Sequence, residues 1–257
     1  MLIYSERVYN YLKEWVSLQA IKSNKAGYVC VFTGGLDSLL TAALCLRSTS
    51  SLHTTIIFMG FKPENENVFE KWVVANFNSD YYTIVRPTHP ELKLPGIEHV
   101  NHIPSMMPVY VDLYCKNNNE LAVGSITKSE YTLVKLFKTR IDDMYDCYPI
   151  IDLYKSECKE LAKLMQLPNQ IINSQSLTEN SFGFNYDQLE WISREDENMR
   201  IISSLSTPNS AKFWALYNEQ NKKLANKVFQ LNKQNKEKII PEQEMCLVRK
   251  ALPGVIN

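Results

Sequence analysis

Residues 33–38, TGGLDS, carry the residue types that bind a nucleotide phosphate. They follow an apolar run, Tyr28–Phe32, that predicts a buried parallel strand, and they precede an alanine-rich run, Leu39–Leu46, that predicts a buried helix. Glycines let backbone N–H groups approach an anion closely, and a helix N-terminus adds unpaired donors and a partial positive charge. Because a carboxylate repels phosphate, Asp37 indicates a Mg²⁺ ion that bridges to the phosphates. The alternative is a plain glycine turn in which Asp37 caps the helix.

A second polar turn, residues 124–130 with the sequence GSITKSE, follows the apolar run Glu120–Gly124. Lys128 can neutralise phosphate, and Glu130 can supply the second carboxylate to the magnesium that Asp37 binds. The alternative is that Thr127 caps the next helix, with Glu130 at the capping-box position. The presence of the first turn favours the phosphate interpretation.

The elements that position these turns alternate between helix and strand. Helices are predicted at 3–22, 63–77 and 103–116, and strands at 28–32, 54–59, 81–85 and 120–124. This order predicts an α/β fold with a doubly wound, mostly parallel, five-stranded sheet, helices on both faces and further C-terminal helices. Ligands bind such sheets at the carboxyl ends of the strands, so we expect Phe58 and Met59 to touch an adenine.

Composition excludes several classes of protein. The 257 residues have a formal net charge of zero, which gives no nucleic-acid or membrane signature to the whole chain. No apolar run reaches transmembrane length, and the early charges of the N-terminus are unlike those of a signal peptide. The six cysteines form no CxxC motif and are predicted to be free thiols of a cytoplasmic protein.

We expect two domains, a nucleotide-binding domain at 1–205 and a C-terminal helical extension at 206–257. The extension contains a basic helix at 212–238 and an irregular segment at 241–257. The polar face of that helix carries seven lysines and two glutamates. It is predicted to be a solvated face; covering the site or meeting a nucleic acid is the less favoured alternative.

TGGLDS resembles the SGGxDS loop of the ATP pyrophosphatase (PP-loop) families, with Thr33 in place of the first serine. The later motifs are similar to those of one of these families, NAD synthetase. GSITKSE resembles its GTxNKSE segment, FKTRIDDMYDCYPI at 137–150 its FTKYGDGxxDxxPI segment, and DLYKSECKELA at 152–162 its DLYKTQVRELA segment. The resemblance covers roughly residues 26–195.

The resemblance implies ATP and Mg²⁺ as cofactors and a homodimer. It places Lys155 on the family's phosphate-binding lysine, and Asp142 and Asp146 on its two aspartates. The expected catalytic residues are Asp37, Lys128 and Lys155, and the expected metal ligands are Asp37 and Glu130. The expected ATP-binding residues are Thr33, Gly34, Gly35, Leu36, Asp37, Ser38, Phe58, Met59, Ser125 and Lys155; those for the acceptor are Asp142, Asp146, Thr178 and Glu179.

The sequence departs from the family in the acceptor-binding segments. The arginine-bearing NxKARxR helix is replaced by NHIPSMMP at 101–108, and the loop that carries PSADL and QxDE is shortened to 173–181. The acids at 142–146 are also compatible with a solvated turn.

The sequence therefore predicts an amide-forming ligase that adenylates a small-molecule carboxylate with ATP and then transfers ammonia. One alternative is an adenylating enzyme for another acceptor, such as a modified base, sugar or nucleic acid, as in 7-cyano-7-deazaguanine synthase. That family needs a cysteine cluster for zinc, which this chain lacks. The other alternative is a nucleotide-binding module without turnover.

Overall fold

The structure, a computed structural model, describes residues 5–48, 52–59, 61–87, 103–134, 145–174, 187, 190, 191, 194 and 245–252. Its centre is a parallel sheet of four strands in the order β3-β2-β1-β4. The strands are β1 (Gly27–Phe32), β2 (His53–Phe58), β3 (Tyr82–Val85) and β4 (Glu120–Val123). All six residues of β1 are buried, because this strand has a neighbour on each side and helices on both faces.

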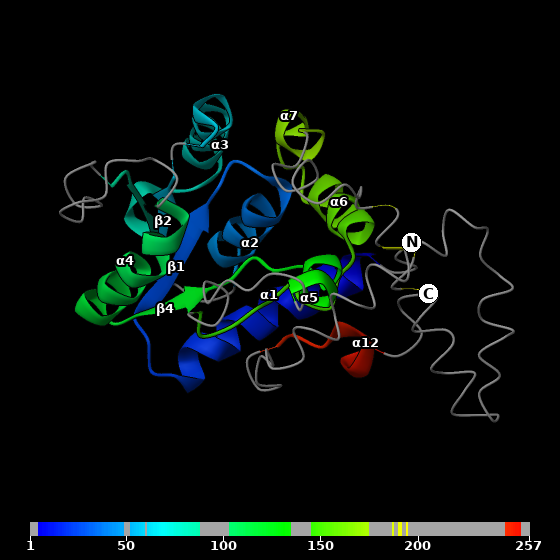
Figure 1. Cartoon of the computed structure of the whole chain (residues 1–257). Helices are drawn as coiled ribbons and strands as arrows, with labels where there is room; N and C mark the ends of the chain where they lie inside the picture. The colour runs from blue at the N-terminus through cyan, green and yellow to red at the C-terminus, as the bar shows by residue number, and fades with distance from the viewer. Residues whose placement is uncertain are drawn as a thin grey trace, which may run out of the picture.

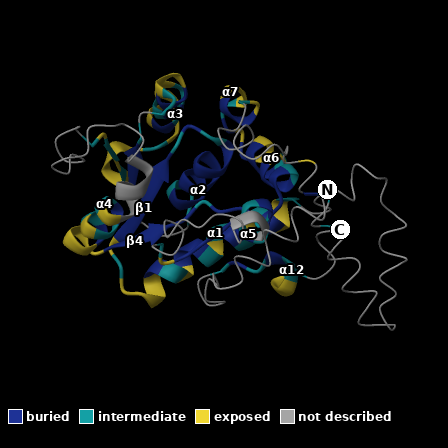
Figure 2. Cartoon of the chain, in the orientation of Figure 1, coloured by how far each residue is buried: buried dark blue, intermediate teal, exposed yellow. Residues whose placement is uncertain are grey.

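Helices cover both faces of the sheet, as predicted (Figure 1). α1 (Ser5–Lys22), α2 (Leu36–Leu46), α3 (Pro63–Asn76) and α6 (Lys155–Leu164) contribute to one large core with the even-numbered side chains of β1. α4 (Ile103–Asn118) packs on the opposite face, where Val111 and Cys115 meet Val29 and Val31. Figure 2 shows the buried sheet and α2 enclosed by helices whose outer sides are exposed.

The predicted α/β fold with a parallel sheet is confirmed, and the described residues form four of the five predicted strands. Next to β4, where a fifth strand would lie, Cys147 makes only an isolated parallel bridge to Val123. Two features end the pairing there. The Asp146 carboxylate, rather than a backbone carbonyl, accepts the hydrogen bond of Ala122 N at 2.8 Å, and Pro149 has no N–H to donate.

The remaining elements are short. They are the 3₁₀ turn η1 (Ser79–Tyr81), α5 (Lys128–Val134), α7 (Asn169–Ile172) and α12 (Val248–Ala251). α12 corrects the prediction that 241–257 is irregular, because Val248 is buried in the main core and anchors this turn. The predicted helix at 212–238 and the predicted boundary between 205 and 206 lie outside the described residues.

Two predictions about composition can be compared with the fold. All six cysteines are free and buried, as expected, and Sγ of Cys30 lies 3.3 Å from Sγ of Cys45. Over the described ranges, no helix is long and apolar enough to cross a membrane.

Candidate active site

The two polar turns predicted to bind phosphate follow neighbouring strands. β2 follows β1 in the chain and pairs with one edge of β1. β4 comes later in the chain and pairs with the opposite edge of β1. The strand order therefore reverses between β1 and β4, and this point is where open α/β sheets bind ligands. TGGLDS follows β1 and GSITKSE follows β4, so the topology brings both turns to the same edge of the sheet, at the carboxyl ends of neighbouring strands.

The first turn is held by its own hydroxyls. Ser38 Oγ accepts a hydrogen bond from Thr33 N at 3.1 Å, lies 3.1 Å from Thr33 Oγ1 and donates to Gly35 O at 3.0 Å. Gly35 precedes the first residue of α2, and no side chain caps this helix end. The N-terminus of α2 thus keeps unpaired backbone donors, as a phosphate cradle requires.

Gly34 needs to be glycine for two reasons. Its φ angle is +82°, in the region that side chains disfavour, and a Cβ there would lie 2.7 Å from Cβ of Lys62. The stem of Lys62 therefore packs directly on the turn. Nδ2 of the buried Asn65 donates to Gly34 O at 2.7 Å, so the start of α3 also fixes the turn. Sequence reasoning missed both Lys62 and Asn65.

Asp37 and Lys155 form a buried ion pair, in which Nζ of Lys155 donates to Oδ2 of Asp37. The other oxygen, Oδ1, is buried and has no hydrogen-bond partner among the described residues. Burial raises the pKa of Asp37 to about 7; Lys155 opposes this shift and Glu130 adds to it. The structure therefore brings together three of the predicted residues, Asp37, Lys155 and Glu130.

This arrangement fits the expected Mg²⁺. Oδ1 of Asp37 is buried without a partner among the described residues, and Glu130 raises the pKa of the Asp37 carboxyl; both features suit carboxylates that share a cation. Among the described residues, no group of three or more His, Cys, Asp and Glu side chains could hold a metal. Mg²⁺ is commonly bound by one or two protein carboxylates, with phosphate oxygens and water as its remaining ligands.

The second turn also forms the capping box that was the alternative explanation of its sequence. Thr127 N donates to Glu130 Oε2 at 3.3 Å, and Glu130 N donates to Thr127 Oγ1 at 3.4 Å. Glu130 thus caps α5 and also acts on Asp37. A Cβ on Gly124 would lie 2.5 Å from Cε1 of Tyr148, so only glycine allows the ring to pack there.

Lys128 is placed differently from Lys155. Its Nζ lies 3.4 Å from Asp152 Oδ1 and 5.1 Å from the centre of the Tyr154 ring. Its backbone N donates to Leu153 O at 2.8 Å, which ties the start of α5 to the segment before α6. Lys128 and Lys155 therefore both lie at the DLYK segment, 152–155.

The residues predicted to contact adenine differ in their burial. The side chain of Phe58 is buried between Phe32 and Phe69, with ring centres 5.4 and 6.3 Å away. Arg86, which sequence reasoning missed, lies 4.9 Å above the Phe58 ring. The Phe58 ring is thus enclosed by other side chains, while Met59 and Ser125 are half-buried. The contact of Phe58 and Met59 with an adenine stays a prediction.

Of the residues predicted to bind the acceptor, Asp146 is described, and one of its oxygens is bonded to Ala122 N at the edge of β4. Asp142, Thr178 and Glu179 lie outside the described residues.

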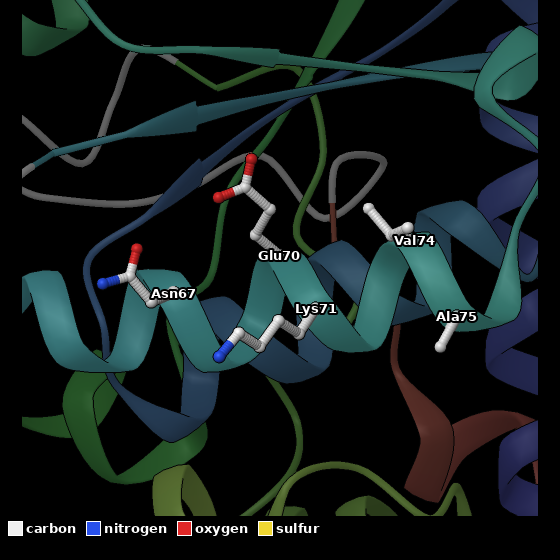
Figure 3. Close-up of a pocket in the computed structure, with 5 residues that line it drawn as sticks. All are labelled: Asn67, Glu70, Lys71, Val74 and Ala75. Carbon is white, nitrogen blue, oxygen red and sulfur yellow. The ribbon is translucent and has the colours of Figure 1, made fainter.

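A hollow of about 400 Å³ on the surface of α3 contains none of the predicted site residues. Figure 3 shows its lining residues, which all come from this helix: Asn67, Glu70, Lys71, Val74 and Ala75.

A glycine phosphate turn at the switch point of a parallel sheet defines a nucleotide-binding α/β protein. The family model described as NAD synthase matches residues 8–192, which is more than half of the chain, so the chain belongs to the NAD synthase family of carbon–nitrogen ligases. This match confirms the family resemblance seen in the sequence motifs.

Two relatives by sequence and one solved structure are similar to this chain. The NH(3)-dependent NAD(+) synthetase of Finegoldia magna is 24% identical over 195 residues, 70% of this chain and 80% of the relative. That of Archaeoglobus fulgidus is 28% identical over 226 residues, 81% of this chain and 87% of the relative. The structure of the NH3-dependent NAD synthetase from Campylobacter jejuni, 19% identical, has the same fold, with a TM-score of 0.65 over 92% of this chain and 98% of that one.

Proposed function

We propose that this chain converts a carboxylate to a carboxamide with ATP and ammonia, and that the carboxylate is that of nicotinic acid adenine dinucleotide. The observation that carries the proposal is the state of Asp37 beside the phosphate turn. One carboxylate oxygen is neutralised by Lys155 and the other is buried without a described partner. Membership of the NAD synthase family supports the reaction class, and the names of its relatives support the substrate.

The reaction has two steps. An oxygen of the substrate carboxylate attacks the α-phosphorus of ATP, the bond to the β-phosphate oxygen breaks, and pyrophosphate leaves. Ammonia then attacks the acyl carbon of the adenylate, AMP leaves, and the amide nitrogen loses a proton to water. No protein nucleophile is required, so positioning and charge stabilisation supply most of the rate acceleration.

The residues of the chain have separate tasks in this scheme. Backbone N–H groups of residues 34–38 bind phosphate oxygens, and Asn65 and Ser38 keep that turn in shape. Lys155 and Lys128 stabilise the negative charge that grows on pyrophosphate. Asp37 and Glu130 would hold Mg²⁺, which supplies further neutralisation of the phosphates when it is bound.

The test is a pyrophosphate-release assay with ATP, Mg²⁺ and ammonium over a set of carboxylates. The set includes nicotinic acid adenine dinucleotide and nicotinic acid mononucleotide. We expect turnover with the dinucleotide, at least about a hundredfold loss in Lys155→Met, and little change in Lys159→Met, which alters an exposed lysine one turn further along α6.

Two other results of this assay would each contradict part of the proposal. Turnover with a different carboxylate alone would reject the dinucleotide and favour another acceptor, which the altered acceptor segments also allow. Binding of ATP without release of pyrophosphate for any carboxylate would favour a nucleotide-binding module.

The homodimer stays a prediction, and light scattering that returns the mass of one chain would contradict it.

A further inference from the structure

The last described segment of the chain, 245–252, is built into the main body. Met245 forms a parallel bridge to Tyr148, and Cys246 N donates to Tyr148 O at 3.1 Å. Cys246 and Val248 are completely buried in the main core. α12 lies beside α1 (Figure 1). This segment therefore has a fixed position from which a side chain can act on the site.

That side chain is Arg249. Its backbone N donates to Asp152 Oδ2 at 2.8 Å, and its Nη1 donates to the backbone oxygen of Asp152. Its Nη2 donates to both oxygens of Glu157, at 2.8 and 3.0 Å. Asp152 and Glu157 lie on either side of the predicted phosphate-binding lysine, Lys155, so one guanidinium ties together both ends of the segment that carries it.

Glu157 depends on these contacts because it is completely buried. Its carboxylate accepts from Tyr154 N at 2.8 Å and from Arg194 Nη2 at 3.0 Å, in addition to Arg249. The bond to Tyr154 N joins the third residue of α6 to the residue before the helix, which fixes its first turn. Lys155 is the first residue of that turn, so the orientation of Glu157 determines the direction in which Lys155 leaves the helix.

Among the described residues, the charges that contact Asp152, Glu157 and Glu190 balance. Three carboxylates meet three cations in contacts of 2.8 to 3.4 Å: Asp152, Glu157 and Glu190 with Lys128, Arg194 and Arg249. The same three cations surround the buried ring of Tyr154, at 5.1, 4.3 and 4.9 Å from its centre. Removing Arg249 would leave one excess negative charge within two residues of Lys155. That charge would compete with Asp37 for the ammonium group.

We infer that Arg249 is a positioning residue, which holds Lys155 against Asp37 through Glu157 and Asp152. It does not touch the phosphate turn in the described structure. The effect of Arg249 on turnover rests on the proposed function, whereas its effect on Lys155 itself does not.

The first experiment measures Lys155 directly, without any substrate. The folded parent, Arg249→Met, Arg249→Lys and Lys250→Met are treated with a small acetylating reagent, and the modification of Lys155 is measured by mass spectrometry relative to exposed Lys159. We expect the ratio to rise at least about fivefold in Arg249→Met and less in Arg249→Lys. It should stay at the parent value in Lys250→Met, which changes the exposed neighbour. An unchanged ratio in Arg249→Met overturns the inference, whatever the activity of the parent.

A second variant keeps the test valid if Arg249→Met does not fold. The pair Glu157→Gln with Arg249→Met restores the charge balance, and glutamine can still accept from Tyr154 N. Its Lys155 ratio should lie near that of the parent, and a ratio as high as in a denatured sample overturns the inference.

The kinetic readout separates positioning from loss of folded protein. In Arg249→Met we expect kcat to fall roughly tenfold while the KM for the carboxylate stays within about twofold, with partial recovery in Arg249→Lys. Absence of turnover in the parent would reject the proposed function and leave the acetylation result to decide on Arg249.

Discussion

The ammonium group of Lys155 occupies one oxygen of the Asp37 carboxylate, and the second oxygen is buried without a hydrogen-bond partner among the described residues. Burying an ionised carboxylate is costly unless its charge is compensated. Burial raises the pKa of Asp37 to about 7, and Lys155 acts in the opposite direction. We propose that a magnesium ion on the second oxygen compensates the remaining cost of burial.

The first prediction concerns the charge of Asp37. Asp37→Asn removes one negative ligand from the proposed cation, and turnover should fall at least about a hundredfold, equivalent to about 3 kcal/mol of transition-state stabilisation. The asparagine oxygen still accepts from Lys155, so the fold should survive. Pyrophosphate release and circular dichroism measure the two effects. Turnover at the parent rate would refute the metal-binding role of Asp37.

The second prediction concerns Asn65, which supports the phosphate turn from α3. Asn65→Ala removes the 2.7 Å hydrogen bond to Gly34 O. Since a bond of this kind contributes about 0.5–1.5 kcal/mol, ATP affinity should fall roughly two- to tenfold. Asn67→Ala is the matched control, because it removes an exposed asparagine from the same helix. Calorimetric titration with ATP compares the three proteins, and equal affinity of Asn65→Ala and the parent would remove Asn65 from the site.

The sequence analysis predicted a strand, a glycine turn and a helix around residues 33–38, and the structure confirms these elements for a physical reason. The phosphate turn depends on a contiguous strand, glycines and a helix, so its geometry is encoded locally. Asp37 and Lys155 are 118 residues apart, and only the resemblance to a family connected them. The support from Asn65 could not be predicted, because the third residue of a helix reveals nothing about which loop it faces.

The sequence could not show where the sheet ends beyond β4. Cys147 and Tyr148 lie in an apolar stretch, but strand pairing requires backbone donors. The Asp146 side chain and Pro149 interrupt them at β4. Phe58 is buried, as expected for a residue of this strand, but its packing against Phe32 could not be predicted, because nothing in the local sequence specifies which side chains meet in the core. Arg249 is 97 residues from Asp152, and no local pattern connects the two.

The third prediction compares two glycines. A Cβ on Gly124 would meet the Tyr148 ring at 2.5 Å, whereas a Cβ on Gly35 would meet nothing closer than Thr33 Oγ1 at 3.8 Å. Gly124→Ala should therefore lower the free energy of unfolding by about 1–3 kcal/mol, the usual cost of overpacking. Gly35→Ala should unfold near the parent midpoint but bind ATP more weakly, because its Cβ enters the proposed phosphate cradle. Urea denaturation and ATP titration of both variants give the comparison; equal stability of the two variants would contradict it.

A buried acid at the other end of the sheet leads to the fourth prediction. Glu120 begins β4, and its side chain passes over Gly27 of β1 to accept hydrogen bonds from Thr55 Oγ1 at 3.0 and 3.2 Å. A Cβ on Gly27 would lie 2.4 Å from His53 O and 3.1 Å from Glu120 Oε1, so glycine makes this crossing feasible. His53 Nδ1 also lies 3.2 Å from Glu120, and its Nε2 lies 3.0 Å from Thr83 Oγ1.

Burial raises the pKa of the Glu120 carboxyl above its ordinary value, although His53 and Thr55 act in the opposite direction. The folded chain therefore holds this proton more tightly than the unfolded chain does. As pH rises from the unfolded pKa, about 4.3, through the raised folded pKa, the contribution of this group to stability must fall, and it stays low at higher pH.

Glu120→Gln removes the titration and keeps an acceptor for Thr55. The stability of the parent minus that of this variant should thus decrease as pH rises from about 4 towards neutrality. Urea unfolding at a series of pH values measures the difference, with Glu64→Gln, at an exposed acid of α3, as the control. A difference that is independent of pH, or that increases with pH, would show that burial does not control the ionisation of Glu120.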